Sequence, residues 1–283
     1  MAVISSTFRA SDGTSIYWWF SPPDEPARAK VVLVHGLGAH SESVNFRLLR
    51  DYLNDQSFSV YGFDLRGFGR SRGRRAYVSS WQKYADDLQQ FLGIIQASDP
   101  DGPLFLLGMS LGGLAVVNYA ARRPAGIQGV IALSPAFSTA GIPAWRGMLI
   151  SLFAKVLPAL SIRTKVNDQG LTRDQALQAK LLRDPLRQKK LTLRLAVEIG
   201  STIRETIGML QQFRLPLLVM HGTADTIVPS EAGKLLHAEA GSSDKQIVLF
   251  DGALHSLLME TNRQEVFEQI HSWLSARIPA KNG

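Results

Sequence analysis

Short runs of apolar residues alternate along most of the chain with longer segments of helical periodicity. The apolar runs after residue 30 are too continuous for strands with one solvated face, which predicts strands buried on both sides of a parallel sheet. These runs are Val31–Val34, Phe58–Gly62, Leu104–Leu107, Gly129–Leu133, Leu217–Met220 and Gln246–Phe250. The helical segments between them are Glu42–Asn54, Ser79–Gln96, Leu111–Arg122, Ser230–Ala240 and Gln264–Arg277. This alternation predicts an α/β fold with a doubly wound sheet.

Two further β-rich runs stand at the start of the chain. Val3–Phe8 and Ser15–Phe20 flank the turn-forming sequence Ser11-Asp12-Gly13, which predicts an antiparallel hairpin at a sheet edge. With this hairpin the predicted sheet has eight strands, most of them parallel.

One stretch interrupts the alternation. Residues 137–213 contain helical patterns broken by Pro143, Pro158, Gly170 and Pro185, and no convincing strand. We therefore predict a helical cap over 137–213, inserted into an α/β core formed by 1–136 and 214–283.

Within the predicted cap, Trp145–Ile162 has apolar residues at helical spacing. Such a stripe is typical of a helix that packs onto the core. Packing is the favoured interpretation, and the alternative is a wall of an acyl-chain tunnel or a face that docks on a membrane. Different faces of the helix can do both.

The composition removes several classes of function. The 283 residues include no cysteine, which excludes disulfides, thiolate nucleophiles and cysteine-based metal sites. The net charge of +7 could attract nucleic acid or anionic lipid, but no nucleic-acid-binding motif accompanies it. No histidine pair has metal-binding helical spacing, so we expect no metal. The first residues lack the pattern of a secretory signal. We therefore expect a cytoplasmic protein that could also bind peripherally to a membrane.

The strongest chemical signal is Gly108-Met109-Ser110-Leu111-Gly112, which lies between a predicted strand and a predicted helix. A sharp turn there strains the central backbone and brings the flanking positions together, so that only glycine fits. The turn would expose the Ser110 hydroxyl at a helix N-terminus, which favours a developing anion. We therefore predict that Ser110 is a nucleophile.

A serine nucleophile needs a base, and the base needs an orienting acid. In folds with this turn the acid and then the histidine follow in the chain. His255 lies in the loop after the last predicted strand, and Asp225 lies in the loop after the strand before it. Asp251 competes with Asp225 as the acid, but it is so close to His255 in sequence that a role in loop geometry is favoured.

Acyl transfer also requires donors aimed at the oxyanion. The amide of Leu111 would provide one, and the amide of Leu37, in the loop after the strand Val31–Val34, would provide the other. The glycines at Gly36 and Gly38 also match part of a dinucleotide-binding loop, but Ser41 stands where the third glycine is needed.

Together these segments resemble the monoacylglycerol lipase and lysophospholipase branch of the α/β-hydrolase superfamily. The resemblance rests on five motifs outside the cap, which begin at His35, Asp64, Gly108, His221 and His255. It implies an α/β-hydrolase fold, a Ser110-His255-Asp225 triad and an acyl glycerol substrate. The family often has His before the serine and Met after it, where this chain has Met109 and Leu111.

The resulting hypothesis is hydrolysis of a small-molecule acyl ester through an acyl-enzyme intermediate, without a cofactor. A lysophospholipase, a thioesterase or an acyltransferase could use the same triad, and so could a binding protein that has lost catalysis on the same scaffold. The run Arg70-Ser71-Arg72-Gly73-Arg74-Arg75 could bind a phosphate head group, although a solvated loop is the simpler interpretation.

Overall fold

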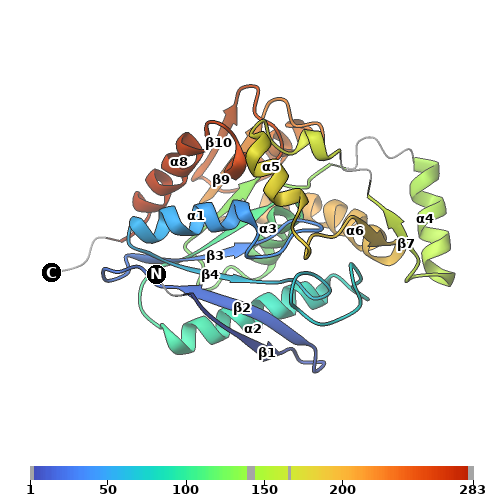
Figure 1. Ribbon diagram of the computed structural model, residues 1–283, viewed down its shortest axis with the longest axis horizontal. Coiled ribbons are helices and arrows are strands. Elements are labelled where there is room, and N and C mark those ends of the chain that lie inside the picture. Colours follow the sequence, from blue (N-terminus) through green and yellow to red (C-terminus); the bar gives the residue numbers. More distant parts are fainter. Residues whose placement is uncertain (1–2, 139–143, 165–166, 280–283) are drawn as a thin grey trace.

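The protein is described by a computed structural model over residues 3–138, 144–164 and 167–279 (Figure 1). Its main sheet has eight strands in the order β1-β2-β4-β3-β5-β6-β9-β10. The strands are β1 (Ile4–Arg9), β2 (Ser15–Ser21), β3 (Ala29–Val34), β4 (Phe58–Phe63), β5 (Leu104–Met109), β6 (Gly129–Leu133), β9 (Leu217–Gly222) and β10 (Lys245–Phe250). From β4 to β10 neighbouring strands are parallel, and the β1–β2 hairpin adds to β4 antiparallel. The predicted sheet is confirmed, including its hairpin edge.

Helices cover both faces of the sheet because successive strand residues point to opposite sides. Val31 and Leu33 of β3 pack with α1 and α8, whereas Val32 and Val34 face the cluster formed with α2, α3 and α7. These helices are α1 (Val44–Asp55), α2 (Gln82–Ser98), α3 (Leu111–Arg122), α7 (Glu231–Glu239) and α8 (Arg263–Ser275). Each lies within a few residues of its predicted bounds.

The last strand differs from its prediction. Gln246–Phe250 was expected to be buried on both faces, but in β10 only Phe250 is buried. β10 is the edge strand, paired with β9 alone. The missing neighbour leaves side chains such as Leu249 exposed.

The chain between β6 and β9, which we call the insertion, contains the helices α4 (Ala144–Val156), α5 (Gln175–Leu182) and α6 (Leu193–Met209). It also contains the 3-10 turns η1 (Asp168–Gly170) and η2 (Leu210–Gln212). Two short strands, β7 (Ser161–Arg163) and β8 (Lys190–Thr192), form an antiparallel ribbon that the sequence did not predict. Residues 139–143 and 165–166 of the predicted cap lie outside the described residues, and the boundaries 137 and 213 stay predictions.

The helix α4 carries apolar side chains that do not pack on the core. Met148 is 73% exposed and Val156 is 76% exposed, and Leu152 and Phe153 are also exposed. α4 contacts α6 and projects at one end of the molecule (Figure 1). The interpretation that this stripe attaches the insertion to the core is therefore wrong for most of its residues. No helix among residues 3–138, 144–164 and 167–279 is long and apolar enough to cross a membrane.

Candidate active site

Ser110 stands at the turn between β5 and α3 and has a strained backbone, with φ 56° and ψ −117°. A β-carbon at Gly108 would lie 2.2 Å from the carbonyl oxygen of Gly112, and one at Gly112 would lie 2.0 Å from that of Val34. Both distances are prohibitive, which gives the physical reason for the two glycines. The structure therefore has the sharp strand-to-helix turn that the sequence predicts around Ser110.

His255 and Asp225 meet although they are 30 residues apart in the chain. His255 Nδ1 lies 2.7 Å from Asp225 Oδ2, so the ring donates Nδ1–H to the carboxylate and directs Nε2 away from it. The other oxygen of Asp225 accepts the backbone N–H groups of Ile227 and Val228 at 2.8 and 2.9 Å. The carboxylate is thereby fixed behind the imidazole.

Asp251, the competing acid, lies elsewhere. Its Oδ1 accepts a hydrogen bond of 3.0 Å from the hydroxyl of Thr223, and its side chain is exposed. This contact shapes the loop between β10 and His255. The geometry brings Asp225 to the histidine and leaves Asp251 at the surface.

His221 is a second histidine in contact with Asp225. Its Nε2 lies 2.9 Å from the carbonyl oxygen of Val228 and 3.2 Å from Asp225 Oδ2. Although burial acts to raise the pKa of Asp225, the hydrogen bonds from His221 and His255 hold this pKa well below its usual range. The carboxylate is therefore ionised at neutral pH.

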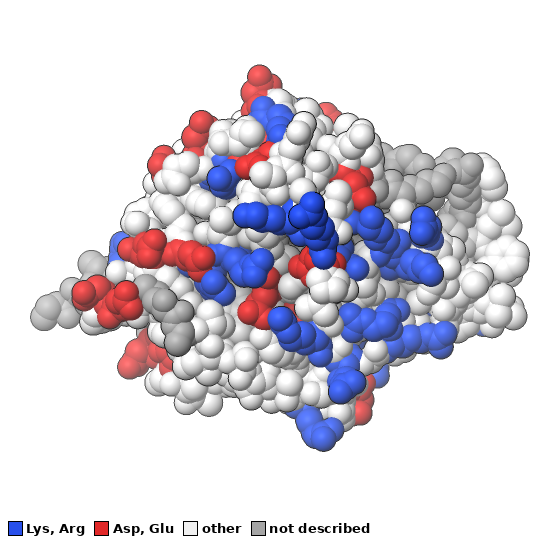
Figure 2. Space-filling view, viewed as in Figure 1, with Lys and Arg blue, Asp and Glu red and all other residues white. Residues whose placement is uncertain are grey.

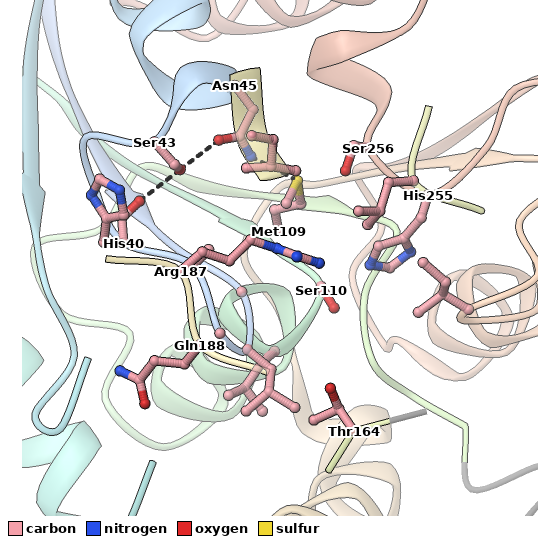
Figure 3. A pocket seen from close by; sticks show the side chains of 18 of the residues that line it. His40, Ser43, Asn45, Met109, Ser110, Thr164, Arg187, Gln188, His255 and Ser256 are labelled. Atoms are coloured by element: carbon pink, nitrogen blue, oxygen red, sulfur yellow. Dashed lines mark hydrogen bonds between the residues drawn. The ribbon is translucent and has the colours of Figure 1, made fainter. Parts of the chain in front are cut away.

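Ser110 and His255 line one cavity of about 200 Å³, and Figure 3 shows both side chains facing it. Leu37 and Leu111, the predicted oxyanion residues, line the same cavity. Among the interactions of the described residues, none joins the Ser110 hydroxyl to the His255 ring. Catalytic hydrogen bonds of unliganded enzymes often tighten only when substrate binds.

The loop after β3 approaches Ser110 closely. A β-carbon at Gly36 would lie 3.2 Å from Ser110 Cβ and 3.8 Å from its Oγ. His35 fixes this loop, since its Nδ1 lies 2.8 Å from the Gly36 carbonyl oxygen and its Nε2 accepts the Leu65 N–H at 2.9 Å. Burial lowers the pKa of His35 to about 4, which keeps the ring neutral and able to accept.

The insertion holds the loop that carries His255. The backbone N–H of His255 donates to the Gly170 carbonyl at 3.3 Å, and that of Ser256 donates to Leu171 at 2.7 Å. A β-carbon at Gly170 would lie 2.5 Å from the hydroxyl of Thr226, next to Asp225. The turn η1 therefore contacts both the histidine loop and the acid loop.

The site lies at the carboxyl ends of the parallel strands, because Leu37 follows β3, Ser110 follows β5, Asp225 follows β9 and His255 follows β10. This edge is where open α/β sheets build their binding sites. The mostly parallel eight-stranded sheet, the sharp turn at Ser110 and the histidine–carboxylate pair are features of the α/β-hydrolase fold. Among the described residues there is no cluster of three or more metal-ligating side chains.

The family model described as "Serine aminopeptidase, S33" matches residues 25–262. The chain belongs to this family and is a serine hydrolase of the lipase and esterase type. The monoglyceride lipase of Mus musculus is 28% identical over 277 residues, which cover 95% of this chain and 90% of that protein.

Two solved structures extend the likeness to the fold. The monoacylglycerol lipase of Paleococcus ferrophilus has a TM-score of 0.82 and 29% identity over 98% of this chain and all of that chain. A soluble variant of the monoglyceride lipase of Saccharomyces cerevisiae, in complex with a substrate analogue, has a TM-score of 0.86 and 26% identity over 98% of this chain and 96% of that chain. The protein is thus monoacylglycerol lipase-like.

Proposed function

We propose that the protein hydrolyses monoacylglycerols through a Ser110-His255-Asp225 triad. The observation that carries the proposal is the 2.7 Å contact between His255 Nδ1 and Asp225 Oδ2, in a cavity that Ser110 also lines. The fold around this contact is shared with monoacylglycerol lipases from distant organisms. Their printed names support an acyl glycerol as the substrate.

In the first step His255 Nε2 takes the proton of the Ser110 hydroxyl while Oγ attacks the ester carbonyl carbon. The tetrahedral intermediate collapses, the bond to the glycerol oxygen breaks, and His255 returns the proton to that oxygen. In the second step His255 deprotonates water, which attacks the carbonyl carbon of the acyl-enzyme. The bond from that carbon to Ser110 Oγ then breaks, His255 returns the proton to Oγ, and the fatty acid leaves. The ionised Asp225 stabilises the imidazolium that forms in both steps.

The negative oxygen of each tetrahedral intermediate would be held by the amides of Leu37 and Leu111. Leu111 is the first residue of α3, where backbone N–H groups have no partner within the helix. Gly36 lies against Ser110, which supports a position of the Leu37 amide close to the ester that Ser110 would attack. Each donor would contribute about 100- to 1000-fold in rate.

Long-chain acyl glycerols reside in membranes or micelles, and the exposed apolar side of α4 would contact such a surface transiently. Met148, Leu152, Phe153 and Val156 are the exposed residues that support this role. Such burial is worth about 1.5–3 kcal/mol for a large side chain.

A fluorophosphonate probe tests the nucleophile. Wild type should be labelled and should release fatty acid from 1-monooleoylglycerol, and Ser110→Ala should lose both. Ser134→Ala is the matched control, because the hydroxyl of Ser134 is buried, has no hydrogen-bond partner in the described part of the chain and does not line the cavity. Unlabelled wild type would show instead a binding protein on the same scaffold.

A further inference from the structure

Arg187 places a cationic group in the cavity of Ser110 and His255, and the proposed mechanism does not use it. It lies in the insertion between α5 and β8, and its side chain extends into the cavity in Figure 3. Its Nη2 donates to the carboxylate of Asp168, whereas Nη1 is buried and has no hydrogen-bond partner among the described residues. Asp168 thus fixes the guanidinium through Nη2, whereas the N–H groups of Nη1 remain available to a ligand.

An unsatisfied buried N–H of a charged group costs free energy, about 1–3 kcal/mol or more. A substrate oxygen within reach of Nη1 would remove that cost. Arginine hydrogen bonds to carboxylate or phosphate oxygens are roughly twice as strong as those between neutral groups. The cavity therefore favours an anionic oxygen over a neutral hydroxyl at this position.

The backbone beside Arg187 is fixed to the loop that contains the predicted oxyanion donor. The N–H of Gln188 donates to the Gly38 carbonyl at 2.8 Å, and its side-chain amide donates to Gly67 at 3.0 Å. The approach is so close that a β-carbon at Gly38 would lie 2.3 Å from the carbonyl oxygen of Gln188. Arg187 is therefore held in register with the reacting centre before any ligand binds.

The surroundings of Arg187 carry an excess of positive charge. Lys189 shares Asp168 with Arg187, so that two cations face one carboxylate. Arg163 and Lys190 are paired in register on the exposed β7–β8 ribbon, next to Thr164, which lines the cavity. Figure 2 shows more Lys and Arg than Asp and Glu side chains over the middle and right-hand part of this face. Such a field raises the association rate of anionic ligands.

We propose that Arg187 is a specificity-determining residue that binds an anionic oxygen, of a phosphate or a carboxylate, on the alcohol side of the ester. The inference rests on the proposed ester hydrolysis and extends it to acyl esters whose head group is charged. Arg187 takes no part in bond making. It selects among alcohols that leave from the same acyl-enzyme.

Three short-chain substrates test this selection without a membrane: 1-octanoylglycerol, 1-octanoylglycerol 3-phosphate and the octanoyl ester of glyceric acid. In Arg187→Gln the kcat/KM ratio of an anionic to the neutral substrate should fall about 10- to 100-fold, as expected for a charged hydrogen bond. In Arg187→Lys this ratio should fall less, because lysine keeps the positive charge but lacks the planar pair of donors. The phosphate and the carboxylate substrates show which anion the site prefers.

Arg183→Gln is the matched control, because Arg183 is exposed in the same segment and does not line the cavity. It should leave both ratios within about twofold. An equal loss on neutral and anionic substrates in Arg187→Gln, or no loss, would overturn the proposal. Fluorophosphonate labelling of Ser110 in each variant keeps this outcome separate from a failure of the hydrolase function.

Discussion

Asp225 has two histidine partners, and only one of them faces the cavity. His255 is the proposed base. Nε2–H of His221 is shared between Asp225 Oδ2, the oxygen that His255 also contacts, and the carbonyl oxygen of Val228. We therefore infer that His221 positions the proposed acid, and its hydrogen bond helps to lower the pKa of Asp225. The sequence showed a histidine four residues before Asp225, but nothing in one chain's pattern indicates that both side chains would turn to the same oxygen.

Replacing His221 by leucine should lower kcat/KM about 10- to 100-fold, since a hydrogen bond to a charged group is lost. The pKa of Asp225 should rise, because a donor that lowers it is gone while burial still raises it. With one donor fewer, the carboxylate stabilises the protonated form of the proposed base more strongly, so the acid limb of the kcat/KM profile should move to higher pH. His221→Gln keeps a donor and should restore much of the activity. An unmoved acid limb in the leucine variant would indicate a purely structural role.

His35 links stability to pH. Its folded-state pKa is lowered to about 4 from 6.5 by burial, so between these values the unfolded chain binds a proton that the folded chain does not. The free energy of unfolding therefore falls as pH drops from 6.5 to 4, by about 3 kcal/mol for this group. Urea unfolding at pH 7 and pH 4 measures this difference in the free energy of unfolding. In His35→Asn the difference should be smaller by the contribution of His35. An identical pH dependence in the variant would contradict the assignment.

At the scale of elements, the turn at Ser110 and its neighbouring elements are what the sequence predicts best. The helix Leu111–Arg122 and the strand Gly129–Leu133 have their predicted bounds, because buried runs and glycine spacing are local signals. The β7–β8 ribbon was missed since strands of three residues have no periodicity to detect. Arg187 was missed for another reason, as its role depends on the distant loop at Gly38.

Gly112→Ala should destabilise the protein by more than about 3 kcal/mol or prevent folding. The new methyl group would meet backbone of β3, which cannot move without disturbing the centre of the sheet. Gly93→Ala is the control, since Gly93 lies exposed inside α2 with open space around it. That change should stabilise the protein by about 0.5–1 kcal/mol. Thermal unfolding of both variants measures the contrast, and a Gly112 variant as stable as wild type would refute the packing account.

At the scale of the whole molecule, loops at the carboxyl edge of the sheet carry the proposed triad. The insertion contributes other residues of the cavity wall, Arg187 among them. The α/β core could be predicted because its strands and helices each carry a strong period. The orientation of α4 could not, because one apolar stripe is compatible with packing inward or facing outward. Only the exposure of Met148 and Val156 separates the two.

If α4 contacts lipid surfaces, the double variant Met148→Gln, Val156→Gln should bind vesicles of phosphatidylcholine and phosphatidylglycerol about 10-fold or more weakly, since two exposed apolar side chains lose their burial. Hydrolysis of monoacylglycerol carried in those vesicles should fall with binding, whereas hydrolysis of soluble p-nitrophenyl butyrate should stay unchanged because neither residue lines the cavity. Leu249→Gln, which changes an exposed apolar position on the edge strand β10, should change neither rate. Cosedimentation with vesicles measures the binding. Equal binding of the double variant and wild type would show that α4 has no part in reaching the substrate.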